Sequence, residues 1–385
     1  MKPVSFLIGG DLVPTKSNFD FFSSGDINKL VDNAILDELY SVDFRVFNLE
    51  VPLTDAGKPI CKCGPNLIAP TSSINGIKAL NPSVICLANN HILDQDENGL
   101  LSTIKQLQKF NIDYVGSGKN LTEAFKPYVL EKIGKKIGIY ACAEHEFTIA
   151  TETMAGANPF EPLESLDHIV ALKSKCDYVI VLYHGGKEHY RYPSPYLQKV
   201  CRKMVQKGAD LIICQHSHCI GCYEEFEGST IVYGQGNFLF DRSESELWKT
   251  SLLIKASISD RVYVDYIPIV KSGNGVRLAD YQVAENILAA FHQRSAEILQ
   301  DGFVEQQYRQ FARDSHLLYV RHFAGFGKWL SRLDRCLFNG MLTRRKYNSN
   351  QLLAIRNFIE CEAHRELVLA GLQGENECGK NQSSK

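Results

Sequence analysis

Seven short apolar segments in the first 240 residues constrain the fold more than any other feature of this sequence. They are rich in Val, Ile, Leu and Cys and show no alternation with polar residues, which is typical of strands that are buried on both faces. The segments are Val4–Gly9, Phe44–Leu49, Val84–Ala88, Ile137–Cys142, Tyr178–Tyr183, Leu211–Cys214 and Thr230–Tyr233. None approaches the roughly 20 apolar residues that a membrane-spanning helix requires.

Amphipathic helical patterns lie between these segments. In Gly99–Ile112 and in Pro195–Gly208 the apolar residues recur at helical spacing, and Pro195 stands where a helix tolerates proline, in its first turn. Strands that alternate with helices favour a layered α/β fold. Val262–Ile269 is expected to be one more strand, at a sheet edge because Pro268 has no backbone N–H.

The character of the chain changes after these strands. Strand patterns end near residue 278, and helical patterns continue from Tyr281 to about Leu372. The remainder is polar and lacks large apolar residues, which is typical of disorder. We therefore expect a first domain over residues 1–275, a helical region over 280–372 and a disordered tail over 373–385.

Composition narrows the class of protein. With 44% hydrophobic and 22% charged residues, the chain resembles an ordinary globular protein. A formal net charge of −2 gives no broad attraction for nucleic acid, so none is expected as a partner. The twelve cysteines accompany no signal-peptide pattern, which favours free thiols in a cytoplasmic protein over a disulfide framework.

Polar side chains follow nearly every predicted strand directly. Because ligands of layered α/β proteins bind at the carboxyl ends of the strands, these side chains are expected to share one site. Carboxylate and imidazole together suit manganese, iron or zinc better than calcium. The residues at the strand ends are Asp11, Glu50, Asn89, Asn90, His91 with Asp94, His184, His216, His218 and Asn237.

Each of these residues alone has an ordinary explanation. A lone histidine is more often a hydrogen-bonded structural residue, a lone aspartate before a helix is usually an N-cap, and a lone asparagine is often a turn residue. The combination changes this balance, because four of the eleven histidines directly follow core strands. We expect a site for one or two divalent metal ions, with the ligands Asp11, Glu50, Asn90, His184, His216 and His218.

The order of these motifs resembles the CapA family, the poly-γ-glutamate capsule synthesis proteins, which belong to the calcineurin-like metallophosphoesterase superfamily. The resemblance covers about residues 4–241 and leaves the helical region uncovered. The matching motifs are Gly10-Asp11, Asn48-Leu49-Glu50, Ala88-Asn89-Asn90-His91 with Asp94, His184-Gly185-Gly186-Lys187-Glu188, His216-Ser217-His218 and Gly236-Asn237-Phe238.

This resemblance implies a four-layered α/β/β/α sandwich with a C-terminal helical extension and a two-metal site. In that site Asp11 and His218 would hold one ion, and Glu50 would lie between the two. The second ion would be held by Asn90, His184 and His216. Two further sets of roles follow: His91, oriented by Asp94, as the catalytic proton donor, and Asn89, Glu188 and Asn237 as candidates for binding substrate. For Glu188, a position in a solvated loop is an equal alternative.

Three positions depart from the family pattern. The wider superfamily usually carries Asp-x-His in the first motif, whereas here Val13 replaces the histidine, as is usual in the CapA branch, so one ion lacks a nitrogen ligand. Gly185 stands where the branch often has tryptophan. Asp96 stands where the branch usually has glycine, so that turn is expected to differ.

Two functions remain open from the sequence. One is a metal-dependent hydrolase of phosphoester, amide or ester bonds in a small molecule or polymer, linked to capsule, poly-γ-glutamate or other exopolymer biosynthesis. The other is a non-catalytic accessory factor that binds metal or polymer in a biosynthetic complex. The His91–Asp94 pair favours the enzyme, and Val13 favours the accessory factor.

The helical region contains a basic and apolar segment over residues 321–346. Seven Lys or Arg and a single acid, Asp334, are interleaved with aromatic and aliphatic residues such as Trp329. A basic amphipathic helix of this kind can lie on the cytoplasmic face of an anionic membrane. The alternative is that the apolar stripe packs on the main domain while the charges face water.

Overall fold

The computed structural model describes residues 3–241 and 243–382, with side chains up to residue 372. The chain divides into two compact units, Met1–Glu305 and Gln306–Lys385. The expected limits at 275 and 280 stay predictions. So does the expected tail over 373–385, since its side chains and the backbone of 383–385 lie outside the described residues.

The first unit is built on an eight-stranded mixed sheet with the order β16-β15-β14-β1-β2-β3-β4, in which β13 also pairs with β1. β1 to β4 and β13 run parallel, whereas β14 to β16 are antiparallel. The strands are β1 (Val4–Val13), β2 (Phe44–Leu49), β3 (Val84–Cys86), β4 (Asp113–Val115), β13 (Asn237–Phe240), β14 (Thr250–Ile258), β15 (Val262–Ser272) and β16 (Gly275–Leu278).

A second, six-stranded sheet has the order β11-β12-β10-β9-β7-β6, with a parallel centre. Its strands are β6 (Tyr128–Lys132), β7 (Lys135–Ala143), β9 (Tyr178–His184), β10 (Leu211–Gln215), β11 (Tyr223–Phe226) and β12 (Ser229–Val232). A small pair is formed by β5 (Ser117–Gly118) and β8 (Gly156–Ala157).

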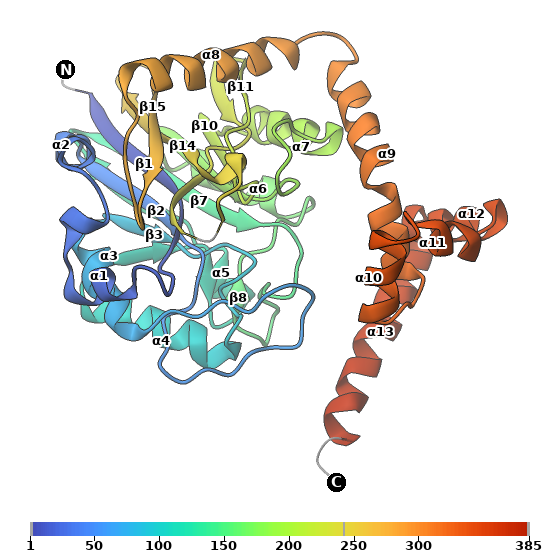
Figure 1. The fold of residues 1–385 in the computed structure, drawn as a ribbon. Helices are drawn as coiled ribbons and strands as arrows, with labels where there is room; N and C mark the ends of the chain where they lie inside the picture. The colour runs from blue at the N-terminus through green and yellow to red at the C-terminus, as the bar shows by residue number, and fades with distance from the viewer. Residues whose placement is uncertain (1–2, 242, 383–385) are drawn as a thin grey trace. The chain divides into compact units, whose positions relative to one another are not determined.

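Helices cover the two sheets on their outer faces (Figure 1). α1 to α4 lie against the first sheet, and α6 and α7 lie against the second. The α-helices of the first unit are α1 (Phe19–Ser24), α2 (Asn33–Ser41), α3 (Ile74–Ala79), α4 (Asp96–Lys109), α5 (Leu121–Ala124), α6 (Ser165–Lys173), α7 (Pro195–Gln206) and α8 (Tyr281–Glu297). Three short 3-10 helices are η1 (Ile27–Lys29), η2 (Thr71–Ser73) and η3 (Glu246–Trp248).

The core explains why the strands lack polar alternation. In β9, Ile180 and Leu182 belong to the apolar cluster between the sheets, whereas Val179 and Val181 belong to the cluster beneath α6 and α7. Successive side chains of a strand point to opposite faces, so both faces of this strand are buried. The expected four-layered α/β/β/α sandwich is therefore confirmed.

From residue 281 onward the described structure is helical, which confirms the expected helical extension. α9 (Phe303–Phe323) crosses the limit between the two units. The remaining helices are α10 (Lys328–Cys336), α11 (Met341–Lys346), α12 (Ser349–Glu360) and α13 (Glu362–Gln382). Among the described residues, no helix combines the length and apolar character needed to cross a bilayer.

The expectation that Val262–Ile269 forms an edge strand is confirmed for residues 262–268, which pair with β14 and have no strand partner on their other side among the described residues. The segment lies in β15, and β16 pairs only with residues 269–272 at the end of that strand. Pro268 is tolerated there because the pairing with β16 ends at its neighbour Ile269, so β14 is its only strand partner among the described residues.

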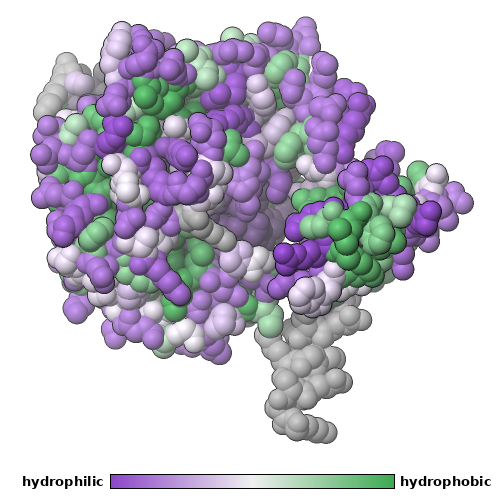
Figure 2. Space-filling view, in the orientation of Figure 1, coloured by the Kyte–Doolittle hydropathy of each residue, from purple (hydrophilic) through white to green (hydrophobic). Residues whose placement is uncertain are grey.

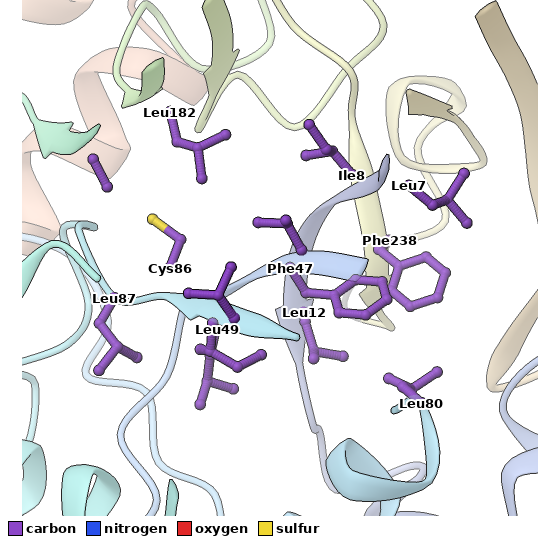
Figure 3. Packing of buried hydrophobic residues seen from close by; sticks show 14 of the residues in the cluster. Leu7, Ile8, Leu12, Phe47, Leu49, Leu80, Cys86, Leu87, Leu182 and Phe238 are labelled. Carbon is purple, nitrogen blue, oxygen red and sulfur yellow. The ribbon is translucent and has the colours of Figure 1, made fainter. Parts of the chain in front are cut away.

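Close backbone approach at the end of β1 shapes the region beside Asp11. A Cβ atom added to Gly10 would lie 2.0 Å from the carbonyl oxygen of Gly236, just before β13. Figure 3 shows the adjoining core, where the Phe47 and Phe238 rings stack with their centroids 5.0 Å apart. Glycine at position 10 thus allows β13 to lie directly against β1.

We predict that Gly10→Ala lowers the free energy of unfolding by about 1–3 kcal/mol or more, because overpacking against backbone cannot be relieved by a rotamer change. Urea unfolding followed by circular dichroism would measure this loss. Gly327→Ala is the matched control, since an added Cβ there meets nothing within 4 Å. Equal unfolding curves for both variants would contradict the close approach.

Candidate metal centre

The six predicted ligands lie at the ends of five strands and are all buried. Asp11 lies near the end of β1, and Glu50 and Asn90 follow β2 and β3 in the first sheet. His184 is the last residue of β9 in the second sheet, and His216 and His218 follow β10. The carboxyl ends of strands from both sheets therefore meet, and the six side chains are brought together.

A first group of ligand atoms surrounds the His184 ring. Glu50, His184 and His216 each offer one atom, and these atoms lie within 4.8 Å of one another. His184 Nε2 lies 3.3 Å from Glu50 Oε1, 3.2 Å from His216 Nδ1 and 3.0 Å from Asn90 Oδ1. Two imidazole nitrogens, a carboxylate and an amide oxygen thus converge on one small volume.

A second group shares Glu50 with the first. Asp11, Glu50 and His218 offer ligand atoms within the same 4.8 Å limit. His218 Nδ1 lies 3.2 Å from Asp11 Oδ2 and 2.8 Å from Asn237 Oδ1. Glu50 is therefore placed between the two groups, as expected for a bridging carboxylate.

The Glu50 side chain shows that these residues fit divalent cations. It is fully buried, and although His184 Nε2 lies 3.3 Å from Oε1, neither carboxylate oxygen accepts a hydrogen bond within the part of the chain that the structure describes. A buried carboxylate without compensation destabilises a fold by several kcal/mol, on the order of the penalty for desolvating an ion. Cations held between Glu50 and its neighbours would provide the missing compensation.

The backbone explains how two histidines one residue apart both reach the site. The φ angles of His216 and His218 are 86° and 54°, in the left-handed region that non-glycine residues rarely adopt. Such strained positions concentrate at functional sites. The intervening Ser217 carbonyl accepts a hydrogen bond of 2.8 Å from the backbone N–H of His189, which fixes this loop against the loop that follows β9.

Two asparagines support the ligands from behind. Asn48 Nδ2 donates a 2.7 Å hydrogen bond to Asp11 Oδ1 and lies 3.2 Å from His184 Nδ1. Asn89 Nδ2 in turn donates to Asn48 Oδ1 at 3.1 Å. Asn89 is fully buried in this chain of contacts, although it was expected as a substrate-binding candidate. Sequence analysis did not assign Asn48 a role, even though it begins the Asn-Leu-Glu motif.

Charges around the second group shift its titration. Burial raises the pKa of Asp11, but the hydrogen bond with His218 and the charges of His184 and His218 leave it lowered overall. Burial lowers the pKa of His218, yet the charges of Glu50 and Asp11 raise it to about 9. Burial and the neighbouring His184 hold the pKa of His216 well below its usual value, so this ring is neutral and competent to bind metal.

A buried ionic group lies beside the cluster. His91 Nδ1 is 2.5 Å from Asp94 Oδ2, so Asp94 lies where a residue orienting this ring is expected. Lys62 completes the group: its Nζ forms an ion pair with Asp94 Oδ1 and lies 3.2 Å from His91 Nδ1. Lys62 was not expected at the site from the sequence, because it comes from a loop without any periodic pattern.

Two of the three departures from the family pattern have local explanations. Asp96 adopts a φ of 63°, a left-handed conformation that glycine adopts readily. Aspartate is among the residues that tolerate this region best. At Gly185 an added Cβ would lie 2.6 Å from Glu144 Cγ, so the Glu144 side chain occupies the space that a larger residue would need.

An open cleft of about 560 Å³ adjoins the metal ligands. His91 and His218 line it from the site, and Glu188 and Trp248 line its wall. The Trp248 ring lies against the His218 ring, with the centroids 4.7 Å apart. Trp248 was not expected from the sequence, since it lies in η3, after the last strand that delivers a ligand.

Comparison with protein families identifies the chain. The family model described as bacterial capsule synthesis protein PGA_cap matches residues 5–242, which is more than half of the chain. The chain belongs to this family. The expected resemblance is thereby confirmed, and the matched residues include all six predicted ligands.

Curated relatives agree with this assignment. The capsule biosynthesis protein CapA of Bacillus anthracis is 29% identical over 243 residues, covering 60% of this chain and 59% of that protein. The PGA biosynthesis protein CapA of Bacillus subtilis (strain 168) is 30% identical over 210 residues, covering 52% of this chain and 54% of that protein. The chain thus spans between half and three fifths of the length of these relatives.

Solved structures provide more distant likenesses. A phosphatase from Mycoplasma pneumoniae matches 74% of this chain and 99% of its own, at 16% identity and a TM-score of 0.44. The NAD nucleotidase of Haemophilus influenzae matches 82% of this chain and 67% of its own, at 13% identity and a TM-score of 0.45. The family assignment does not depend on either structure.

We predict that Lys62→Met lowers the free energy of unfolding by about 3–5 kcal/mol, because it leaves the buried Asp94 carboxylate without its cation. Lys58→Met is the matched control, since Lys58 pairs with Asp96 at the surface, where such a pair contributes about 0–1 kcal/mol. Urea unfolding of both variants would measure the difference. An equally small effect for the two substitutions would contradict a structural role for the buried pair.

Proposed function

We propose that this chain is a metal-dependent hydrolase of phosphoester, amide or ester bonds that serves the biosynthesis of a capsule, poly-γ-glutamate or another exopolymer. The observation that carries the proposal is the pair of ligand groups joined by Glu50, with His91 and Asp94 beside them. A purely structural metal site has little use for an imidazole–carboxylate pair at its edge.

The chemistry follows from what each part supplies. Divalent ions lower the pKa of water and neutralise negative charge that develops on a phosphoryl or carbonyl oxygen. Asp94 hydrogen-bonds to the Nδ1 atom of His91. The Nε2 atom of the same ring is therefore the one that can act in the cleft, which His91 lines. There His91 would donate a proton to the leaving group, a contribution typically worth 10²–10⁴-fold in rate.

The biological setting rests on the relatives. Two of them carry names in capsule or PGA biosynthesis, and a relative from Mycobacterium tuberculosis, 26% identical over 220 residues, is described as a probable polyglutamine synthesis accessory protein. We carry exopolymer metabolism over to this chain as part of the proposal. The identity of the metal, whether manganese, iron or zinc, is left to measurement.

The second candidate is a non-catalytic accessory factor that binds metal or polymer. Val13 favours it, because a valine that is 2% exposed stands in the apolar core where the superfamily usually has a ligand. Under this proposal the two ligand groups would bind metal, but the protein would not hydrolyse any substrate. The two candidates therefore differ in activity at full metal occupancy.

We expect the manganese-loaded protein to hydrolyse generic phosphoesters or amides such as p-nitrophenyl phosphate, bis(p-nitrophenyl) phosphate and γ-glutamyl-p-nitroanilide. His91→Ala should lower kcat by about 100-fold or more, through loss of the proton donor, while elemental analysis shows unchanged metal. His322→Ala removes an exposed imidazole from α9 and is the control. Absence of turnover by fully metal-loaded protein across the panel would support the accessory role instead.

We also propose that the segment 321–346 contacts an anionic membrane surface. Arg321 and Asp334 are buried and form an ion pair, so the acid of this segment does not reduce its surface charge. Trp329 is 81% exposed on α10. Figure 2 shows hydrophobic side chains gathered on the helical unit with hydrophilic ones around them. The exposed basic residues are Lys328, Arg332, Arg335, Arg344, Arg345 and Lys346.

We predict that the full chain floats with vesicles containing about 30% phosphatidylglycerol and not with pure phosphatidylcholine, since each basic residue near an anionic surface contributes about 1 kcal/mol. Trp329→Glu with Leu333→Glu should reduce flotation at least ~10-fold, because it removes apolar side chains that would enter the membrane interface. Leu353→Glu with Phe358→Glu on α12 is the matched control, because these apolar residues are exposed and lie outside residues 321–346. Equal flotation of the two double variants would end the proposal.

A further inference from the structure

The second ligand group has one imidazole where the first has two. Around His184, two imidazoles, one carboxylate and the Asn90 oxygen converge. Around His218, the carboxylates of Asp11 and Glu50 and the Asn237 oxygen accompany a single imidazole. Val13 holds the place of the usual further nitrogen ligand and is packed in the apolar core, so it offers no atom to a cation.

The carboxylate of Glu188, on the loop that follows β9, lies beside this second group. The ligand atoms of Glu188, His216 and His218 lie within 4.8 Å of one another, the same limit that defines the other two groups. Glu188 is only half-buried and also lines the open cleft. It therefore approaches His218 from the side of the site that faces solvent.

The loop that carries Glu188 is fixed in place by its backbone. The Gly185 N–H donates to the Gln215 carbonyl at 3.2 Å, and the His189 N–H donates to the Ser217 carbonyl at 2.8 Å. These two hydrogen bonds flank Glu188 and hold its loop along the His216–His218 loop. The proximity of Glu188 to the histidines thus follows from the backbone and not from a side-chain rotamer alone.

The neighbouring imidazole is engaged elsewhere. His189 Nε2 accepts a 2.9 Å hydrogen bond from Trp248 Nε1. His189 is also absent from the three groups of converging ligand atoms among the described residues. Glu188 is consequently the side chain of this loop that is placed to reach a metal ion.

We propose that Glu188 is a metal ligand that takes the place of the imidazole missing at Val13 and completes the coordination of the ion bound by Asp11, Glu50 and His218. The inference rests on the proposed metal-dependent function. It gives this ion three carboxylates and one imidazole, whereas the other ion has two imidazoles. Carboxylate oxygens suit manganese and magnesium, whereas imidazoles suit zinc. The ion held by Asp11, Glu50, His218 and Glu188 is therefore expected to be Mn²⁺ rather than Zn²⁺.

Mn²⁺ binding to the full chain, stripped of metal by chelation, tests the inference without any substrate. Isothermal titration and elemental analysis should find two equivalents in the unaltered protein. Glu188→Gln should retain one equivalent and weaken the second at least ~10-fold, since loss of even an outer partner weakens metal binding 10–100-fold. Glu188→Asp keeps the charge on a shorter side chain and should lie between the two.

Glu246→Gln is the matched control. It removes the same charge from η3, the element that carries Trp248 to the cleft wall, but it lies outside the three ligand groups. It should bind two equivalents with unchanged affinity. If Glu188 only contacts substrate or lies in a solvated loop, Glu188→Gln will bind Mn²⁺ as the unaltered protein does. That result would overturn the inference while the metal centre stands.

Failure of the broader proposal has a different signature. If the unaltered protein itself binds less than one equivalent of Mn²⁺, Fe²⁺ or Zn²⁺, the metal-dependent function falls together with the role of Glu188. If it binds two equivalents and shows the expected loss in Glu188→Gln without turnover, the ligand role stands and the accessory function is supported.

Discussion

The buried carboxylate of Glu50 is the constraint on which the rest of the site depends. It lies at the junction of the two sheets, fully removed from water, and among the described residues neither oxygen has a hydrogen-bond donor. A charge in this position requires positive charge close by. Without metal, His218, whose pKa is raised, supplies one positive charge, and divalent ions held by the surrounding lone pairs would supply more. The opposed sheets, the close approach of β1 and β13 and the strained histidine loop all serve to bring ligand atoms around this one group.

Much of the fold and of the site could be predicted from sequence because each rests on a local pattern. Strands such as β9 are uniformly apolar since both faces are buried, and the polar residue that ends each strand is visible at once. Lys62 and Trp248 could not be found in this way. They reach the site from a long loop and a short 3-10 helix, and their roles depend on contacts with residues distant in sequence. The edge position inferred from Pro268 holds, because pairing with β16 stops one residue short of it.

The positions that differ from the expected family pattern have local structural features of their own. Asp96 adopts a left-handed conformation that glycine adopts readily. Glu144 fills the space next to Gly185. In our proposal Glu188 likewise supplies from a neighbouring loop the ligand that Val13 cannot provide.

The loop over residues 51–70 is organised around a single side chain that belongs to the site. Asp94 accepts the Leu67 N–H through its carboxylate and the Ile60 N–H through its backbone carbonyl, and it pairs with Lys62. The same loop places Pro65 on the rim of the cleft. The rim of the cleft and the His91–Asp94 pair are therefore mechanically linked. An exchange of this loop must keep Lys62 and must present backbone N–H groups to Asp94 at positions 60 and 67, so proline is excluded at both.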